Sequence, residues 1–461
     1  METINVDILL TNAYILTMDE KRHIIDNGAV AIRDGRIAAV GKNADILKQY
    51  TGERFDCKGG VVHPGLADVH EHAVWHLLRC IVPDTFTVPE VWEYYEDPIV
   101  RNIQAEDERF SLLLATMEMA VNGTTIFGDT GSSRHMAGTF EGANVVGVKG
   151  YTSMGIGDDY TPELKVMEYS LNRCIELFEE ELAKHPRTRA TPVGALVGLA
   201  GMEHCSGDLM VAAKEIARRH GVQMQVHSCV YQSEIEYFRK RYNKTPIEFY
   251  DDLGVLDEGT TLVHVIHVTD HDMEILERRR PSVVHCPGAS MRYGLGAMFG
   301  RFQEMRERGV NIALGTDAGN WCDGLDLFQQ MYLAATAHRE CEQRYPVFTR
   351  EDVFEMATIN GAKALGVGEE CGSIEVGKAA DIVIHSVFRP EMLPASDRLT
   401  ALVYAAQSRS VDSVLVDGEF IVRNGRTTRL NVEEFAPLIN ARQKDMLQRM
   451  RYTIRRSWPV Q

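Results

Sequence analysis

Short, fully apolar segments recur eight times between residues 61 and 316, and a helical stretch follows each of them. The segments are 61–67, 123–128, 145–152, 191–199, 222–227, 260–264, 282–286 and 310–316. Strands that are apolar on both faces indicate a parallel sheet covered by helices on both sides. Eight strand–helix units are the number that closes a (β/α)8 barrel. The sequence therefore predicts an α/β protein built on a TIM barrel over residues 61–370.

Two segments of different texture flank this region. Residues 4–41 alternate between polar and apolar positions and contain turn pairs such as Asp34-Gly35, and the same pattern returns over residues 372–425. Neither segment alone has enough strands to be stable, so we expect them to pair with each other. The predicted units are the first part of a small composite β-sandwich (1–60), the barrel (61–370), the second part of the sandwich (371–430) and a C-terminal helix and tail (431–461).

The charge of the chain excludes two classes of partner. Its formal net charge is −17, whereas nucleic acids and anionic membrane surfaces are bound by basic faces. No apolar run approaches the roughly 20 residues of a membrane helix, and residues 1–7 lack the basic region of a signal peptide. Nine cysteines without any C-x-x-C pair are typical of reduced, cytoplasmic thiols. We expect a cytoplasmic protein with no nucleic acid and no membrane partner.

Side chains that bind metals and protons stand where five of the predicted strands end. The carboxyl ends of barrel strands form the active site of proteins with this fold. An isolated H-x-H pair is more often solvated, but sixteen histidines in 461 residues would not gather at four strand ends by chance. In order along the chain, the strand-end residues are His70 and His72, His227, His264, His285 and Asp317.

These residues lie in phrases that resemble the amidohydrolase superfamily, in its mononuclear branch of cytosine-deaminase-like deaminases and triazine hydrolases. The matching phrases, in family order, are residues 64–72, 226–227, 262–264, 285–287, 314–319, 356–366 and 372–381. The resemblance covers nearly the whole chain, from residue 6 to about residue 425. It implies the barrel with a composite β-sandwich, a small-molecule substrate and a homo-oligomer.

The resemblance also implies one divalent metal ion per subunit. Zn²⁺ is the first candidate and Fe²⁺ or Co²⁺ the alternatives, because three imidazoles and one carboxylate suit all three. Relatives with two metals carry a modified lysine at the end of strand four, and residues 191–199 contain no lysine. In the implied mechanism Asp317 takes a proton from a metal-activated water and His264 stabilises the developing oxyanion. The implied metal ligands are His70, His72, His227 and Asp317.

The sequence departs from the deaminase pattern beside His227. Deaminases of this branch carry a glutamate three residues later, which gives a proton to a ring nitrogen of the substrate, and this chain has Val230 there. Glu234 lies one helical turn too far along, and the usual His-Ala-Pro segment after strand four is replaced by residues 201–206. An aminated ring carbon needs that proton to become electrophilic, whereas an amide or urea carbon does not.

Two functional hypotheses follow. The first, which the missing glutamate favours, is a metal-dependent hydrolase of a non-peptide C–N bond in an amide, urea, carbamate or thiocarbamate, akin to phenylurea and molinate hydrolases. The second is a hydrolytic deaminase or dehalogenase of a purine, pterin or s-triazine type N-heterocycle, with Glu203 or His204 supplying the proton path. A catalytically inactive scaffold is disfavoured because all four implied ligands are present.

The predicted substrate contacts lie in loops that follow the strands. Aromatic side chains there are expected to cover an aromatic substrate, with ordinary loop packing as the alternative, and Arg292 is expected to anchor it. The predicted contacts are Trp75, Glu203, His204, His285, Arg292 and Trp321.

Overall fold

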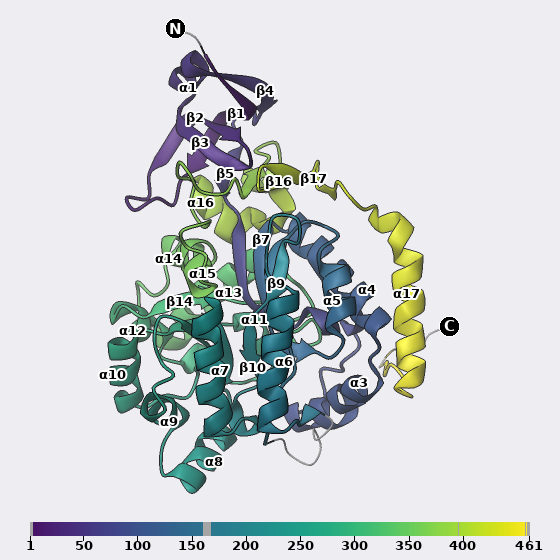
Figure 1. The fold of residues 1–461 in the computed structure, drawn as a ribbon. Helices are drawn as coiled ribbons and strands as arrows, with labels where there is room; N and C mark the ends of the chain where they lie inside the picture. Colours follow the sequence, from purple (N-terminus) through teal and green to yellow (C-terminus); the bar gives the residue numbers. More distant parts are fainter. Residues whose placement is uncertain (1–2, 160–166, 395, 457, 459–461) are drawn as a thin grey trace.

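The computed structural model describes residues 3–159, 167–394, 396–456 and 458. It consists of a barrel with a large sheet at one end and a long C-terminal helix along one side (Figure 1). Residues 1–2, 457 and 459–461, at the ends of the first and last predicted units, lie outside the described residues.

Parallel strands occupy eight positions around the barrel, as the sequence predicts. They form a four-stranded group, β6-β7-β8-β9, and a five-stranded group, β10-β11-β12-β13-β14. β9 and β10 are two halves of the fourth strand, interrupted at Leu196. The bounds are β6 (Leu66–Glu71), β7 (Thr124–Ser133), β8 (Lys149–Met154), β9 (Val193–Ala195), β10 (Val197–Leu199), β11 (Met224–Ser228), β12 (Thr260–His264), β13 (Ser282–His285) and β14 (Asn311–Leu314).

Hydrogen bonds between the first and eighth strand positions close the ring. The backbone N–H of Asp317 donates to the carbonyl of His70 at 2.9 Å. The Asp68 carboxylate accepts from the backbone N–H of Thr316 at 3.0 Å and from its hydroxyl at 2.6 Å. These bonds hold the ends of β6 and β14 together, so His70 and Asp317 become neighbours.

Helices cover the outside of the barrel. In α7 (Gly207–His220) the Ser206 hydroxyl accepts from the N–H of Leu209, Gly221 ends the helix at φ 67°, and the apolar face is buried. The other covering helices are α4 (Ala105–Val121), α5 (Met136–Ala143), α6 (Leu171–Lys184), α8 (Gln232–Tyr242), α9 (Pro246–Asp252), α10 (Asp270–Arg279), α11 (Pro287–Tyr293), α12 (Phe302–Glu307), α13 (Leu327–Glu342), α14 (Arg350–Met356) and α15 (Ile359–Ala364). Within the described ranges, none of the helices combines the length and the apolar character that crossing a membrane requires.

The segments that flank the barrel in sequence join into one nine-stranded sheet. Its order is β18-β17-β16-β15-β5-β1-β2-β3, with β4 beside β1, and the two halves meet where β15 pairs antiparallel with β5. Phe55 of β4 contacts Phe420 of β17 with ring centroids 5.1 Å apart, so the sheet curls over its own apolar face. The bounds are β1 (Ile4–Leu16), β2 (Ile24–Arg33), β3 (Arg36–Lys42), β4 (Tyr50–Asp56), β5 (Val61–Pro64), β15 (Ile382–His385), β16 (Val411–Val416), β17 (Glu419–Arg423) and β18 (Arg426–Thr427), with α1 (Asn43–Gln49) and α16 (Arg398–Ala401) beside them.

The first predicted barrel strand, residues 61–67, is divided by the structure. β5 pairs within the curled sheet, and the barrel strand β6 begins only at Leu66. Gly65 makes the change of sheet possible, since a Cβ at this position would lie 1.9 Å from the Thr125 hydroxyl. The Pro64-Gly65 corner therefore separates a sheet strand from a barrel strand.

A buried lysine joins the barrel to the curled sheet. Lys149 of β8 is 1% exposed, and its ammonium lies 2.9 Å from Glu370, 2.9 Å from Asp381 and 3.0 Å from Asp417. Asp381 immediately precedes β15, and Asp417 forms the turn between β16 and β17. Although burial favours the neutral amine, these three carboxylates raise the pKa of Lys149 above its usual value.

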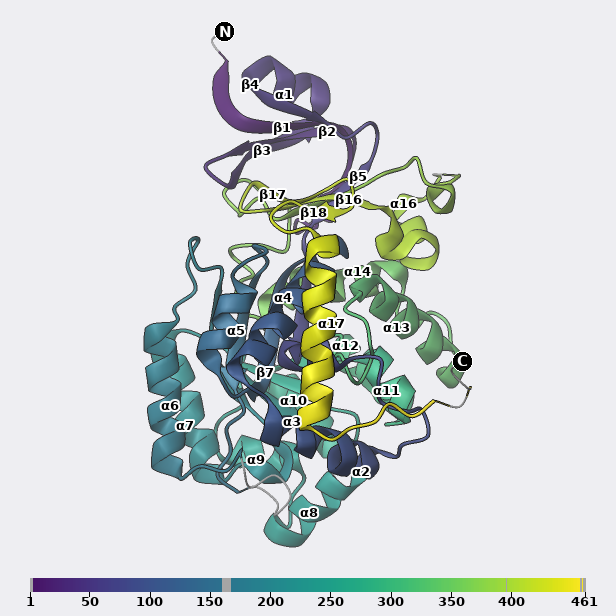
Figure 2. The same ribbon diagram turned by 90° about the vertical axis from the view of Figure 1, so that its right-hand side faces the viewer.

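The C-terminal helix α17 (Val432–Arg449) runs along the side of the barrel (Figure 2). Arg442 and Arg449 form ion pairs with the buried carboxylate of Asp107 in α4, at 2.6 and 2.7 Å. The Tyr452 hydroxyl, just beyond the helix, donates to the carbonyl of Ile81 at 3.0 Å. The tail thus braces the insertion after β6, which contains α2 (Val88–Val91), the π-helix η2 (Trp92–Glu96) and α3 (Asp97–Asn102).

Candidate active site

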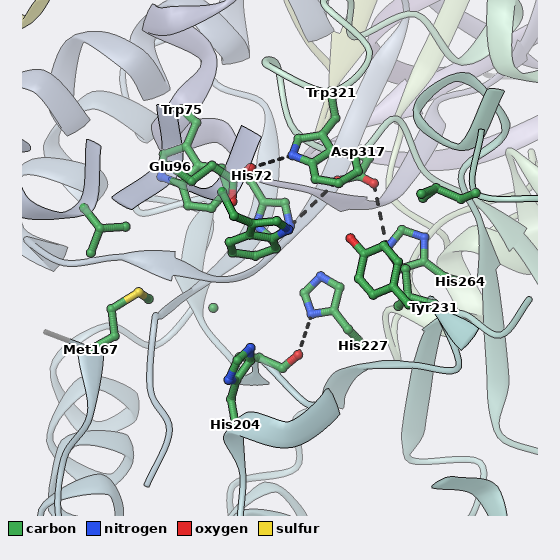
Figure 3. Close-up of a pocket in the computed structure, with 16 residues that line it drawn as sticks. His72, Trp75, Glu96, Met167, His204, His227, Tyr231, His264, Asp317 and Trp321 are labelled. Carbon is green, nitrogen blue, oxygen red and sulfur yellow. Dashed lines mark hydrogen bonds and ion pairs between the residues drawn. The ribbon is translucent and has the colours of Figure 1, made fainter. Parts of the chain in front are cut away.

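Four histidines and one aspartate converge at the carboxyl ends of the barrel strands. Figure 3 shows four of them around one point. One Asp317 oxygen lies 3.7 Å from Nε2 of His70 and 3.8 Å from Nε2 of His72, and the other lies 3.8 Å from Nε2 of His264. The ring of His227 lies 4.8 Å from that of His70, centroid to centroid. All five side chains are buried.

The donor atoms of this cluster fit a metal ion better than they fit one another. Separations of 3.7–3.8 Å are too long for hydrogen bonds. Two ligands about 2.1 Å from one zinc ion lie roughly 3.4 Å apart in a tetrahedron. Nε2 of His70 is fully buried and has no hydrogen-bond partner within the described part of the chain. Nδ1 of His227 lies 3.0 Å from the carbonyl of Ala200, to which it donates when protonated, and this leaves Nε2 for the cluster.

The local electrostatics also fit a cation. Burial and the neighbouring His70 lower the pKa of His72 to about 3, and burial lowers the pKa of His264 to about 4, so both rings are neutral. Burial pushes the pKa of Asp317 upward, but the neighbouring histidines His70, His264 and His72 hold that pKa below its usual value. Neutral imidazoles beside an ionised carboxylate are the protonation states that a metal requires.

Strained backbone accompanies two of these residues. His264 has φ 76° and Asp317 has φ 66°, in the left-handed region that non-glycine residues rarely adopt. Such conformations cost about 1–3 kcal/mol each and cluster at functional sites. The bonds that close the barrel beside Asp317 hold it in this conformation.

A pocket opens onto the cluster. Its walls are mostly aromatic and apolar, which suits a flat organic molecule. Predicted residues in the lining are His72, His227, His264 and Asp317 from the cluster, with Trp75, His204 and Trp321 from the loops. Lining residues that were not predicted include Glu96, Val100, Met167, Tyr231 and Leu295.

Glu96 is the main functional candidate that sequence reasoning missed. Its side chain is fully buried, and Oε1 accepts from Nε1 of Trp321 at 2.6 Å and from Nδ2 of Asn320 at 3.1 Å. Burial raises the pKa of Glu96 to about 7. The residue ends a π-helix in an insertion rather than a barrel strand, so the strand-end rule could not find it; π-helical turns are themselves frequent at functional sites.

Three predicted substrate contacts lie outside the pocket lining, which corrects their placement. Nε2 of His285 lies 3.1 Å from Nε2 of His338, and its ring stacks on Phe302, because this position of β13 faces the covering helices. Arg292 forms an ion pair with Asp323. Glu203 is half-buried in the loop after β10, where burial raises its pKa.

Glu234 does not take the place of the missing glutamate. Its carboxylate accepts from the backbone N–H groups of Cys229 at 2.9 Å and Val230 at 2.8 Å, and it lies outside the pocket lining. Burial raises the pKa of Glu234 to about 8. It organises the loop between β11 and α8, while the family's carboxylate position, Val230, presents an apolar side chain to the pocket.

The amidohydrolase family matches residues 61–421, and the chain belongs to this family. A second match, to the bacterial imidazolonepropionase-like composite domain, covers residues 28–52. The family assignment made from the strand-end phrases is therefore confirmed.

Two relatives of similar length are deaminases by name. The chain is 31% identical to a 5'-deoxyadenosine deaminase of Methanosarcina acetivorans, over 93% of this chain and 95% of the relative. It is also 31% identical to a 5-methylthioadenosine/S-adenosylhomocysteine deaminase of Syntrophobacter fumaroxidans, over 94% and 97%.

Solved structures share the fold at lower identity. An adenosine deaminase from Xanthomonas campestris with bound zinc superposes with a TM-score of 0.86 at 22% identity, covering 98% of this chain and 100% of that one. The zinc complex of atrazine chlorohydrolase from Arthrobacter aurescens TC1 gives a TM-score of 0.86 at 20% identity, with 95% and 100% covered.

Proposed function

We propose that this protein is a mononuclear, metal-dependent deaminase of an aminated N-heterocycle, with an adenine-type ring as the first candidate. The observation that carries the proposal is a cluster of metal-ligand type at one side of a pocket walled by Trp75, Trp92, Trp321 and Tyr231. A flat heterocycle lying between these side chains presents its ring edge to the cluster.

The relatives support this choice over hydrolysis of an amide or urea. The missing glutamate favours the amide or urea hypothesis on sequence grounds, but the deaminases named above match almost the entire chain. The second of the two hypotheses is therefore the better supported.

His70, His72, His227 and Asp317 are the proposed ligands of one divalent ion, with Zn²⁺ first and Fe²⁺ or Co²⁺ as alternatives. When bound, such an ion lowers the pKa of a coordinated water to about 7. Asp317 accepts a proton from the attacking water and delivers it to the departing amine. His264, with Nε2 3.8 Å from Asp317, stabilises the oxygen that becomes negatively charged.

The proposal also includes a cytoplasmic, homo-oligomeric enzyme. Support for the compartment comes from the cysteines, all nine of which are free thiols.

The pocket's aromatic walls exclude water around the ring, so the attacking water is the one held at the cluster.

Ammonia release from a substrate panel tests the proposal. The panel contains 5'-deoxyadenosine, adenosine, an aminopterin-type ring and an aminated s-triazine, against an arylurea, an anilide and a thiocarbamate. Release from the first group and about one divalent ion per chain are expected. Turnover of the second group alone, or two ions per chain, would contradict it.

Matched histidine variants complete the experiment. His227→Ala is expected to lose the metal ion and all detectable turnover while remaining folded. His271→Ala is the control, because His271 is an exposed residue of α10 that pairs only with Glu274 in the described structure. Equal activity of the two variants would remove His227 from the site.

A further inference from the structure

Glu96 lines the pocket and has one carboxylate oxygen that no described residue contacts through a hydrogen bond. While Oε1 accepts two hydrogen bonds, Oε2 is buried and has no hydrogen-bond partner among the residues that the structure describes. A buried, unpaired carboxylate oxygen costs free energy unless a ligand completes its hydrogen bonds. Figure 3 shows Glu96 among the side chains that line the pocket, joined to Trp321.

No other carboxylate in the described lining is available for the substrate ring. Asp317 belongs to the metal-type cluster, and Glu96 is the only further carboxylate among the described residues of the lining. Glu234 is held by two backbone N–H groups, and Glu203 lies outside the lining. Burial lowers the pKa of His204, the other predicted proton path in the lining, to about 4, so its ring is neutral. Glu96 is therefore the one carboxyl group among the described lining residues that is left to supply the ring proton.

We propose that Glu96 is the catalytic acid of this enzyme: its Oε2 donates a hydrogen bond and then a proton to the ring nitrogen next to the amino-bearing carbon. This role rests on the proposed deaminase function. It places the acid on the insertion after β6 rather than beside His227.

The surroundings of Glu96 suit this role. Trp321 and Asn320 both donate to Oε1, so the acidic proton resides on Oε2, the oxygen without a hydrogen-bond partner among the described residues. A pKa of about 7, raised by burial, keeps a substantial fraction of Glu96 protonated at neutral pH. Two kinds of titratable group surround Glu96. The negative charge of Asp317 raises the pKa of Glu96 further. The nearby tyrosines stay neutral because burial raises the pKa of each; they are Tyr95, Tyr231 and Tyr293.

The reaction returns Asp317 and Glu96 to their starting protonation states. In the addition step the water oxygen bonds to the amino-bearing carbon, one water proton passes to Asp317, and the ring nitrogen receives the Glu96 proton as the C=N electron pair moves onto it. In the elimination step the bond from carbon to the amino group breaks, and the nitrogen takes the Asp317 proton and leaves as ammonia. The hydroxyl proton then passes to Glu96 as the C=O bond forms, which restores both residues.

Glu96→Gln tests the acid. The amide oxygen still accepts from Trp321, and the amide NH₂ still donates to a ring nitrogen, but it has no acidic proton to transfer. With the substrate identified by the panel, kcat is expected to fall about 10²–10⁴-fold, while KM stays within about threefold and the metal content is unchanged. Glu93→Gln is the matched control, because Glu93 lies on the same π-helix with an exposed side chain.

Binding gives a second readout that does not depend on turnover. Purine riboside and 1-deazapurine riboside differ only by N versus CH at the ring position that Glu96 is proposed to contact. The deaza compound is expected to bind about tenfold more weakly to the wild type and to Glu96→Gln, since one hydrogen bond is lost. In Glu96→Leu the two affinities should become equal, with thermal melting confirming a folded protein.

The outcomes separate the two proposals. If the wild type releases ammonia from no member of the panel, the proposed function fails. If the wild type deaminates a substrate and Glu96→Gln matches its kcat within threefold, or the deaza penalty persists in Glu96→Leu, the acid role of Glu96 fails while the deaminase function stands.

Discussion

Replacing Lys149 by Met should destabilise the protein by several kilocalories per mole. The ammonium of Lys149 compensates the carboxylates of Glu370, Asp381 and Asp417 where the barrel meets the curled sheet. Glu370 keeps a second cation in Arg187, and Asp417 is partly exposed. The side chain of Asp381 is 1% exposed, and within the described part of the chain it has no other cation when Lys149 is removed.

The magnitude follows from that buried charge. Removing one partner of a buried ion pair costs about 3–5 kcal/mol. With an unfolding entropy of about 2.1 cal/mol/K per residue, the 461 residues give roughly 1 kcal/mol/K for a chain that unfolds as one unit. The melting temperature at pH 7 is therefore expected to fall by about 3–5 °C.

The cost should depend on pH in a defined direction. Burial raises the pKa of Asp381 even beside Lys149, and without the ammonium that pKa rises further. Burial alone would raise the pKa of Glu370, but the hydrogen bond from Arg187 and the charge of Lys149 lower it to about 2, so its pairing contributes stability at neutral pH that disappears in acid. Because of both effects, the free energies of unfolding of the wild type and of Lys149→Met should differ less at pH 4 than at pH 7.

Calorimetric melting of four proteins tests the predicted loss of stability: the wild type, Lys149→Met, Lys48→Met and the double variant Lys149→Met/Asp381→Asn. Lys48→Met applies the same change to an exposed pair with Asp45 and should shift the stability by less than about 0.5 kcal/mol. Adding Asp381→Asn to Lys149→Met removes the stranded charge and should recover more than half of the loss. A loss under 1 kcal/mol for Lys149→Met, or no recovery in the double variant, would refute the reasoning.

Two further outcomes are expected. Thr316→Val removes the hydroxyl that donates to Asp68 at 2.6 Å, and this loosens the strand end that carries Asp317. The affinity for zinc, measured by competition with a chelator, should therefore fall about tenfold. An unchanged affinity would show that other contacts hold Asp317. Glu234→Gln removes a carboxyl whose pKa is raised to about 8 by burial. Its protonated form stabilises the fold at low pH, and that contribution is lost as pH rises from about 4.5 through 8. The free energy of unfolding of the wild type, measured in urea relative to this variant, should therefore decline between these two pH values. A difference that does not change with pH would contradict the buried position of Glu234.

The barrel and the metal-type cluster could be read from the sequence because both depend on local periodicity. Alternation of apolar strands with helices predicts the closed parallel sheet, and the carboxyl ends of its strands must then meet at one rim. The five residues of the cluster each stand at or beside a strand end, so closing the barrel brings them together independently of the loop conformations. They are His70, His72, His227, His264 and Asp317.

The rest of the pocket was decided by contacts between distant segments. His285 also ends a strand, yet it faces α13, and Arg292 is neutralised by Asp323. Glu96 enters the pocket because Trp321, 225 residues away, holds its carboxylate. Strand period fixes which residues reach the rim, whereas the direction of a loop side chain depends on partners that only the folded chain supplies. The sequence alone therefore determined the metal-type half of the site, and the tertiary structure decided which further carboxylate lines the pocket.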